Sequence, residues 1–317
     1  MATALEPKRS PFEVPAARPL DPAKFRDPLV TAKGEARATV PLVRLDTLWL
    51  NTGTLCNLAC TSCYIESSPV NDALVYLSLG EAETFMDEAR AMGTREIGFT
   101  GGEPFMNRDI VPMIRAALDR GFELLVLTNA MRPMRRFEAA LLDIPAADRG
   151  RITFRVSLDH FTQALHEAER GPGTWAKAVD GLKWLAAQGF GVAVAGRRLG
   201  DEAEERAGYE ALLGELGIAV RHLVLFPTMD PHADVPEIST ACWDILGVSP
   251  ETPMCATSRM VVKAKGDASP HVVACTLLPY DPGFAMGATL AEAARPVHLN
   301  HPHCARFCVL GGASCSG

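Results

Sequence analysis

The stretch "LDTLWLNTGTLCNLACTSCYIESS", residues 45–68, places three cysteines directly after a segment that alternates like a β-strand. These cysteines, Cys56, Cys60 and Cys63, are one ligand short of the four that a structural zinc site normally takes. They could be small buried side chains, part of a zinc site completed from elsewhere, or three ligands of an iron–sulfur cluster. We favour the cluster, because three thiolates leave one iron open for a non-protein ligand.

Strand and helix patterns alternate from this stretch to residue 227. Strands are expected in 45–53, 95–104 (running into a glycine turn), 122–130, 151–159, 190–196 and 219–227, and helices in 81–92, 109–121 (with Asp109 as the cap), 132–143, 174–188 and 201–216. Such alternation predicts an α/β fold with parallel strands and right-handed crossovers. The periodicity fits either a doubly wound sheet or a partial (β/α) barrel. In both, the cysteine loop lies at the carboxyl ends of the strands, where these folds place their chemistry.

Composition narrows the class of protein. The formal net charge of −7 argues against a nucleic-acid-coating role, and no apolar run approaches the roughly 18 residues that a membrane helix needs. The first 25 residues are rich in proline and charge and lack an apolar signal core, so we expect a cytoplasmic protein without membrane contact. In that reducing compartment, nine cysteines indicate metal binding or catalysis rather than disulfides.

Composition and the strand–helix pattern divide the chain into three parts. Residues 1–43 resemble an extended arm with scattered prolines. Residues 44–235 contain the strand–helix alternation. Residues 236–317 form a small cysteine-rich domain, because the alternation stops after Pro227 and six of the nine cysteines follow.

The spacing Cys-x3-Cys-x2-Cys resembles the signature of the radical S-adenosylmethionine (SAM) superfamily. Four later segments are similar to strand-end segments of that family, in the same order: "FTGGEP" (99–104), "LTNA" (127–130), "VSLDH" (156–160) and "HEAERGPGTW" (166–175). The resemblance implies that SAM occupies the open iron and that the following residues surround it: Gly101, Gly102 and Glu103 at its amino group, Asn129 at the mouth, Ser157 at its ribose or carboxylate, Asp159 on the substrate side, and Arg170 at its carboxylate. One position departs from the family, since Ser62 stands where many members carry an aromatic residue that packs near adenine; Tyr64 lies two positions later.

The resemblance covers roughly residues 45–227 and implies a partial (β/α)6, TIM-like barrel. It also implies an oxidoreductase in which a reduced [4Fe–4S] cluster cleaves SAM to a 5′-deoxyadenosyl radical, which abstracts hydrogen from a substrate. A flavodoxin- or ferredoxin-like protein would then supply the electron. We expect a maturase acting on a peptide, a protein side chain or a natural-product intermediate. Two alternatives stay open: cofactor biosynthesis on a small molecule, and a non-catalytic iron–sulfur or zinc module that carries electrons or regulates.

The tail holds a second group of cysteines, Cys255, Cys275, Cys304, Cys308 and Cys315, with Cys242 apart as a buried or spare thiol. Cys255 and Cys275 flank a predicted hairpin centred on Gly266. The layout resembles the auxiliary-cluster domains called SPASM or twitch, which implies one auxiliary [4Fe–4S] cluster on Cys255, Cys275 and two of the last three cysteines. A zinc knot and free thiols are the alternatives. The histidines of "VHLNHPHC" (297–304), His298, His301 and His303, are interpreted as a solvated loop rather than as ligands.

Overall fold

A computed structural model describes residues 18–227 and 232–312 of the 317-residue chain. Its strands are β1 (Thr39–Val40), β2 (Thr47–Asn51), β3 (Glu96–Thr100), β4 (Glu123–Thr128), β5 (Ile152–Ser157), β6 (Gly191–Arg198), β7 (Leu223–Pro227), β8 (Ser258–Val262), β9 (His271–Val273), β10 (Ala285–Gly287) and β11 (Val297–His298). Its α-helices are α1 (Leu79–Ala91), α2 (Ile110–Asp119), α3 (Arg132–Arg135), α4 (Glu138–Leu142), α5 (Ala146–Arg149), α6 (Gln163–Arg170), α7 (Thr174–Ala187), α8 (Glu202–Leu216) and α9 (Cys242–Leu246). Four short helical turns, labelled η, are η1 (Pro104–Met106), η2 (Met254–Ala256), η3 (Pro282–Phe284) and the π-helical η4 (Cys304–Val309).

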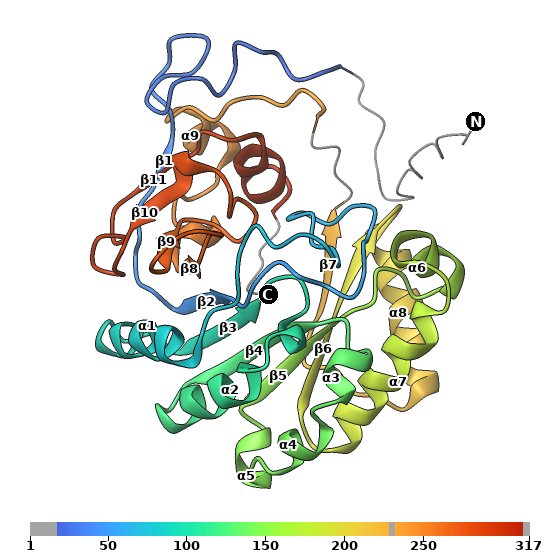
Figure 1. Ribbon diagram of the computed structural model, residues 1–317. Helices are drawn as coiled ribbons and strands as arrows, with labels where there is room; N and C mark the ends of the chain where they lie inside the picture. The colour runs from blue at the N-terminus through green and yellow to red at the C-terminus, as the bar shows by residue number, and fades with distance from the viewer. Residues whose placement is uncertain (1–17, 228–231, 313–317) are drawn as a thin grey trace, which may run out of the picture.

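One sheet runs through the molecule in the order β10-β9-β8-β2-β3-β4-β5-β6-β7. Strands β2 to β7 are parallel and follow the order of the chain. A doubly wound sheet reverses its strand order at a switch point, and no such reversal occurs among these six strands. Figure 1 shows helices α1, α2, α7 and α8 along the outer side of the curved sheet. The predicted α/β fold is confirmed, and the strand order selects the partial barrel.

The elements form where local chemistry favours them. Helix α1 begins with a capping box, in which the Ser78 side chain accepts from the backbone N–H of Glu81 while the Glu81 carboxylate accepts from the backbone N–H of Ser78. Its Ala82, Phe85, Met86 and Ala89 are buried, as their helical spacing predicts. Every residue of β2 is buried, which is typical of a parallel strand covered on both faces.

Two predicted helix features are different in the structure. The helix expected over 132–143 is split into α3 and α4, and the Phe137 ring between them packs against Phe105, with ring centroids 5.8 Å apart. Asp109 stands at the N-cap of α2 but makes no capping bond there. Its carboxylate accepts instead from the backbone N–H of Leu79, at 3.3 Å, so it links α2 to α1. Tertiary contacts override the local pattern at both places.

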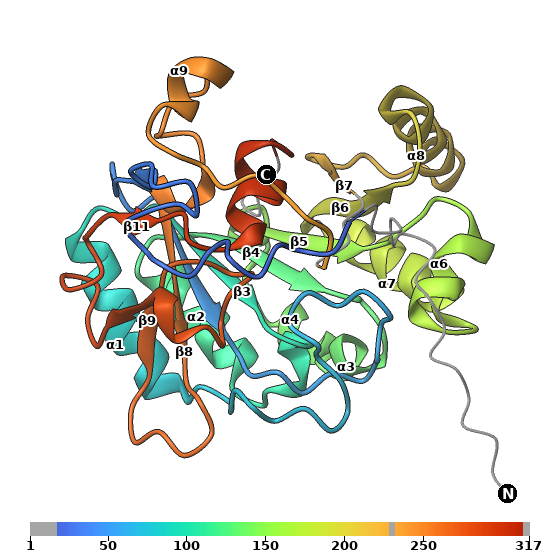
Figure 2. The ribbon, with the colours of Figure 1, turned by 90° about the horizontal axis from the view of Figure 1, so that it is seen from above.

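The tail continues the main sheet. Strand β8 pairs in parallel with β2, and β8 and β9 form the hairpin that was predicted around Gly266. The described part of the arm lies on the tail, where β1 pairs with β11. Figure 2 shows the blue arm beside the orange and red tail strands. Among the described residues, no helix combines the length and apolar character that a membrane crossing requires.

Candidate functional site

The three cysteines of the loop after β2 line one cavity of about 180 Å³. Cys56 is buried, and Cys60 and Cys63 are half-buried. Backbone N–H groups of the loop donate to two of the sulfurs: that of Leu58 to Cys56 Sγ at 3.5 Å and that of Ser67 to Cys63 Sγ at 3.3 Å. The loop therefore directs its thiols towards a shared space.

The rest of the lining comes from the ends of the parallel strands and the segments that follow them. These residues are Thr100, Gly101 and Gly102 after β3, Leu127, Thr128 and Asn129 at β4, Ser157, Asp159 and Arg170 after β5, Ala195 and Arg197 on β6, and Phe226 on β7, with Tyr64 and Ser67 from the loop. The structure thus brings Gly101, Gly102, Asn129, Ser157 and Arg170 together with the cysteines. These residues follow one another around the edge of the cavity in the order of the strands that carry them.

Gly101 and Gly102 are required by the close approach of two backbones. Gly101 has a φ of +138°, and a Cβ there would lie 2.5 Å from the carbonyl oxygen of Gly53. A Cβ on Gly102 would lie 2.4 Å from the carbonyl oxygen of Leu55. The absence of side chains allows the turn after β3 to dock on the cysteine loop, with Gly102 N–H donating to Gly53 O at 2.9 Å.

Glu103 is enclosed by protein and does not line the cavity. Its carboxylate accepts three hydrogen bonds: from the backbone N–H of Phe105 (3.2 Å), from Thr128 Oγ1 (2.8 Å) and from the backbone N–H of Asn129 (2.8 Å). Burial raises the pKa of this carboxyl to about 7, although the three hydrogen bonds act in the opposite direction. Glu103 therefore fixes the end of β4, and direct contact with SAM remains a prediction from the resemblance.

Arg170 forms a two-pronged ion pair with Asp159. Its Nε lies 2.7 Å from Asp159 Oδ2 and its Nη2 lies 3.1 Å from Oδ1. Arg197 approaches the same carboxylate, with Nε 3.6 Å from Oδ1. Burial works to raise the pKa of Asp159, but the two guanidinium groups lower it below its usual value. The predicted contact of Arg170 with a SAM carboxylate would form beside this pair.

Two residues that the sequence analysis did not assign to the site, Glu169 and Arg197, hold the position of the cysteine loop. The Ser62 backbone N–H and hydroxyl both donate to Glu169 Oε1, at 2.6 and 2.7 Å. Arg197 donates to the carbonyl oxygen of Ser62 at 3.0 Å, and its guanidinium lies 5.1 Å from the ring centre of Tyr64. The only sequence signals were a glutamate beside Arg170 and an arginine pair ending a buried strand.

The donor set of the loop fits an iron–sulfur cluster. Burial raises the pKa of the Cys56 thiol to about 12 and that of Cys60 above its ordinary value, so the thiolates need a strongly positive partner such as iron. One zinc ion, with Zn–S bonds of about 2.3 Å, holds its sulfurs within about 4 Å of one another. Among the described residues, no group of three or more His, Cys, Asp or Glu is arranged around a single ion in this way. A cluster spaces its ligands more widely, because each thiolate binds a different iron.

Four tail cysteines line a second cavity. They are Cys255, Cys275, Cys304 and Cys308, in a lining otherwise made mostly of apolar side chains such as Leu277, Leu278 and Phe284. Burial raises the pKa of Cys255 to about 11 and that of Cys304 well above its ordinary value. Cys315 lies outside the described residues. Cys242 is elsewhere, with its sulfur accepting from the backbone N–H of Ser239 at 3.4 Å.

A fully buried arginine, Arg259, stands behind these tail cysteines. Its guanidinium donates only to main-chain carbonyls in the described part of the chain: those of Ala293, Cys255, Ser258 and Arg295. Burial lowers the pKa of Arg259 to about 10, although Cys255 and Cys275 act to raise it. A thiolate cluster in the cavity would give this cation a negative neighbour.

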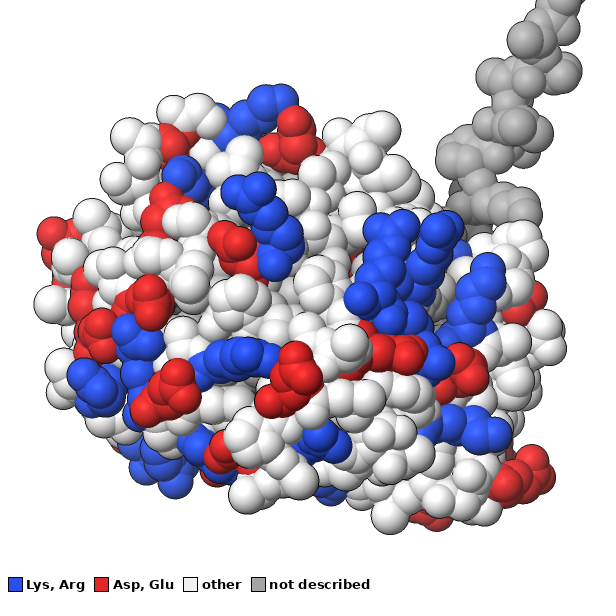
Figure 3. Space-filling view, turned by 60° about the horizontal axis from the view of Figure 1, so that its bottom comes forward, with Lys and Arg blue, Asp and Glu red and all other residues white. Residues whose placement is uncertain are grey.

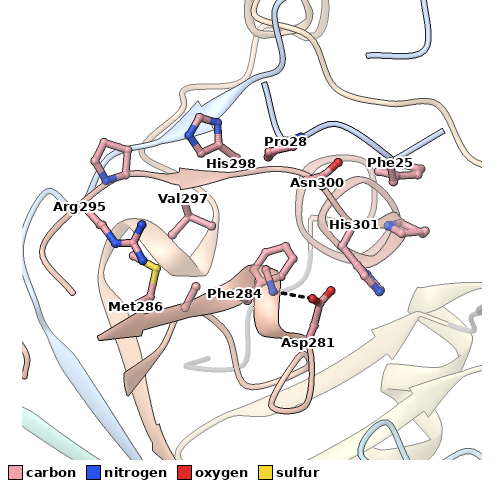
Figure 4. Close-up of a pocket in the computed structure, with 14 residues that line it drawn as sticks. Phe25, Pro28, Asp281, Phe284, Met286, Arg295, Val297, His298, Asn300 and His301 are labelled. Atoms are coloured by element: carbon pink, nitrogen blue, oxygen red, sulfur yellow. Dashed lines mark hydrogen bonds between the residues drawn. The ribbon is translucent and has the colours of Figure 1, made fainter. Parts of the chain in front are cut away.

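A larger cavity of about 400 Å³ lies where the arm meets the tail. Figure 4 shows it between Phe25 and Pro28 of the arm and a tail rim that includes Asp281, Phe284, Val297 and His301. No cysteine of the described ranges lines it. Phe284 and Val297 also line the four-cysteine cavity, so these two side chains form the wall between the two spaces. Of the histidines interpreted as a loop, His298 and His301 line this cavity and His303 lines the cysteine cavity.

A comparison with protein families matches residues 50–205 to the radical SAM superfamily, the span that carries the cysteine loop and the rim residues of β3 to β6. The chain belongs to the radical SAM superfamily. A curated relative, mycofactocin maturase MftC of Mycobacterium ulcerans, is 30% identical over 135 residues, which cover 43% of this chain and 35% of that protein. The chain therefore matches only about a third of that relative's length.

Another curated relative shows a similar level of identity. GTP 3′,8-cyclase of Pseudomonas fluorescens is 29% identical over 149 residues, covering 46% of this chain and 43% of that protein. Among solved structures, native anSMEcpe with bound AdoMet aligns with a TM-score of 0.56 at 14% identity, covering 80% of this chain and 81% of that one. At that identity the structural match supports the fold. Membership of the superfamily implies a [4Fe–4S] cluster and SAM as cofactors.

Proposed function

We propose that this radical SAM protein is a maturase-type enzyme that binds its SAM-cleaving [4Fe–4S] cluster on Cys56, Cys60 and Cys63. The observation that supports the proposal is a single cavity in which these thiols face polar groups from the ends of successive strands. When bound, the reduced cluster supplies one electron that cleaves the SAM sulfonium, giving methionine and a 5′-deoxyadenosyl radical that abstracts hydrogen from the substrate. The protein binds the cluster and SAM, orients them towards the substrate, and excludes water from the site.

The rim residues can bind the polar parts of SAM. Asn129 and Ser157 offer uncharged polar groups, and the Asp159–Arg170 pair offers a fixed carboxylate and guanidinium in a buried setting. Solvent screens the charges of a buried pair only weakly. The carboxylate and the guanidinium therefore attract each other strongly, and this attraction holds both side chains in one orientation. We assign Gly101 and Gly102 the role of keeping the backbone of the turn after β3 close to the cysteine loop. The amino group of SAM can then contact the turn while SAM binds the cluster on the loop.

We place the substrate in another cavity, which adjoins the SAM cavity and is distinct from the four-cysteine cavity of the tail. This cavity, of about 170 Å³, shares Cys63, Gly101 and Ser157 with the SAM cavity and extends to Trp49 and Phe307. Its lining is mostly apolar. An apolar enclosure beside the reacting carbon suits radical chemistry, because it keeps water and other reactants away from the substrate carbon.

The tail cavity supports the proposal of one auxiliary [4Fe–4S] cluster held by Cys255, Cys275, Cys304 and Cys308. Leu277 lines both the substrate cavity and this tail cavity, so a cluster there would lie next to the substrate. Four protein thiolates leave no open iron, which suits electron relay rather than substrate binding. The zinc knot and the free thiols remain as alternatives.

Peptide maturation is favoured by the relative named as a mycofactocin maturase and by a solved structure of the same fold, native anSMEcpe with bound AdoMet and Cp18Cys peptide. The cyclase relative supports a second candidate, an enzyme of small-molecule cofactor biosynthesis, at similar identity. The two can be separated by measuring which addition, a short precursor peptide encoded near the gene or GTP, stimulates 5′-deoxyadenosine formation by the reconstituted protein.

The central test replaces Cys56, Cys60 and Cys63 together by alanine. Wild-type protein reconstituted with iron and sulfide should form 5′-deoxyadenosine from SAM under dithionite, and the triple variant should form none. The variant should keep about four irons per chain if the tail holds its own cluster, against about eight in the wild type. Equal 5′-deoxyadenosine rates would overturn the proposal, and a wild type without any would favour the electron-carrier reading.

A further inference from the structure

A groove of about 570 Å³ lies on the outer side of the cysteine loop. Its floor includes Asn57, Leu58, Met106, Met131, Pro133 and Thr174, and its basic side chains are Arg132 and Arg136 of the α3 region and Lys177 of α7. We call it the basic groove. Among the residues that the structure describes, no carboxylate lines it.

The three cations of the basic groove are exposed, and within the described residues none of them forms an ion pair. The nearby Arg135 does, because it pairs with Glu138 and Asp180. In Figure 3, which brings the lower part of the molecule forward, several basic side chains stand together towards the right, with acidic side chains directly below them. On a chain with a net charge of −7, three exposed cations in one groove without ion pairs among the described residues are a local exception.

Only the loop segment between Cys56 and Cys60 separates the basic groove from these two cluster ligands. Asn57 and Leu58 lie between Cys56 and Cys60, and the Leu58 N–H donates to Cys56 Sγ at 3.5 Å. Asn57 is held by Asn129, whose Nδ2 donates to Asn57 Oδ1 at 2.9 Å. A partner in the groove would therefore contact residues that touch the cluster ligand Cys56, without entering the SAM cavity.

We propose that the basic groove is the docking site of an acidic one-electron donor protein carrying a flavin or an iron–sulfur centre, a partner that rests on the proposed function. The reduced donor passes one electron to the loop cluster and is itself oxidised by one electron, and no atom is transferred. Complementary charge would steer the donor to the groove and set its orientation, which raises the association rate more than the final affinity.

An acidic peptide substrate is the other partner that such a charge would attract. The position of the groove favours the donor, because the loop segment 57–58 and the end of β4 stand between the groove and the cavities where hydrogen abstraction would occur. A peptide bound there would still have to reach around this wall. An electron donor only needs the short path to Cys56.

The test reverses the three charges, as Arg132→Glu, Arg136→Glu and Lys177→Glu in one variant. Formation of 5′-deoxyadenosine is measured at low ionic strength with either reduced flavodoxin or dithionite plus methyl viologen as the electron source. We expect the flavodoxin-driven rate to fall about ten-fold or more, and the chemically driven rate and iron content to stay within about two-fold of the wild type. Added salt should slow the wild type towards the variant with flavodoxin only.

A matched control reverses Arg18, Lys33 and Lys183, three exposed basic residues that do not line the groove. It carries the same net charge as the test variant and should keep the flavodoxin rate. Three results would overturn the docking proposal: unchanged flavodoxin rates in the test variant, equal losses with both reductants, or loss of binding to a hexaglutamate peptide with flavodoxin rates intact. A wild type that is inactive with the chemical reductant would instead count against the proposed function.

Discussion

Glu103 is a motif residue whose carboxylate is bound by the protein itself. The resemblance predicts a contact between the glycine–glycine–glutamate turn and SAM, and that contact stays a prediction; in the structure the carboxylate faces Phe105, Thr128 and Asn129 in a fully enclosed space. Single-sequence reasoning identified the residue but could not give the direction of its side chain. That direction depends on β4, which is distant in the sequence.

We expect Glu103→Ala to lower both stability and SAM affinity while the absorbance of the cluster remains. The change leaves three buried hydrogen-bond donors without an acceptor, which costs about 2–4 kcal/mol of unfolding free energy. It also frees Thr128 and Asn129, which line the SAM cavity. Urea unfolding and calorimetric titration with SAM measure the two effects.

The exposed Glu123 at the start of β4 provides the control, because within residues 18–227 and 232–312 its carboxylate makes only one long ion-pair contact, with Arg151 at 3.8 Å. Glu123→Ala should change neither quantity appreciably. If Glu103→Ala binds SAM as tightly as the wild type, Glu103 has no part in the site.

His166 makes stability depend on pH. It is fully buried, neither ring nitrogen has a hydrogen-bond partner within the described residues, and burial, with Arg170 nearby, lowers its pKa to about 4. The unfolded chain binds this proton near pH 6.5, so stability should fall on acidification from pH 6.5 towards 4, by about 1.4 kcal/mol per pH unit once the unfolded residue is protonated. Urea unfolding at pH 7.5 and 5.5 should show a smaller loss in His166→Leu. Identical losses in the two proteins would exclude His166 as the cause.

At the scale of elements, the sequence predicted most of the strands whose ends line the site. Strands followed by polar or glycine-containing segments identified the rim, because parallel strands bring their carboxyl ends to one edge. Contacts between distant side chains were out of reach. The Ser62–Glu169 bonds join the loop to the end of α6, and no local pattern announces them.

These bonds predict that Glu169→Ala weakens the hold of the loop on its cluster. The variant loses the acceptor for both the backbone N–H and the hydroxyl of Ser62, so the segment between Cys60 and Cys63 should become more mobile. We expect iron to be lost to a chelator several-fold faster than from the wild type, measured by the decay of cluster absorbance. Glu167→Ala on the same helix serves as the control, since the Glu167 carboxylate accepts from Gln163 and from the backbone N–H groups of Gly173 and Trp175 at the start of α7, and none of these belongs to the cysteine loop. Equal decay in the two variants would refute the anchoring role.

At the scale of the whole molecule, the proposed boundary near residue 236 separates two stretches of sequence that share one sheet. Composition marks the change, but only the pairing of β8 with β2 shows that the tail strands extend the sheet of the core. Lys263, just after β8, adds an ion pair to Glu81 of α1 at 2.6 Å. The sequence could not predict this pairing, because its partners come from distant parts of the chain.

A shared sheet predicts that core and tail unfold together. Scanning calorimetry of the cluster-loaded protein should show one transition, because separating the tail would break the β2–β8 ladder and expose buried apolar strands. The Cys255→Ala variant should shift that transition to lower temperature without splitting it. Two resolved transitions in the wild type would show that the ladder does not couple the two parts.

The same ladder has a consequence for the newly made chain. On the ribosome β2 emerges long before β8, so the core can gather its parallel strands while one border of the sheet still presents unpaired backbone N–H and C=O groups. That border carries the fully buried strand that precedes the cysteine loop. Until β8 arrives, a neighbouring nascent chain could pair there instead, so the final third of the protein protects the first from self-association during synthesis.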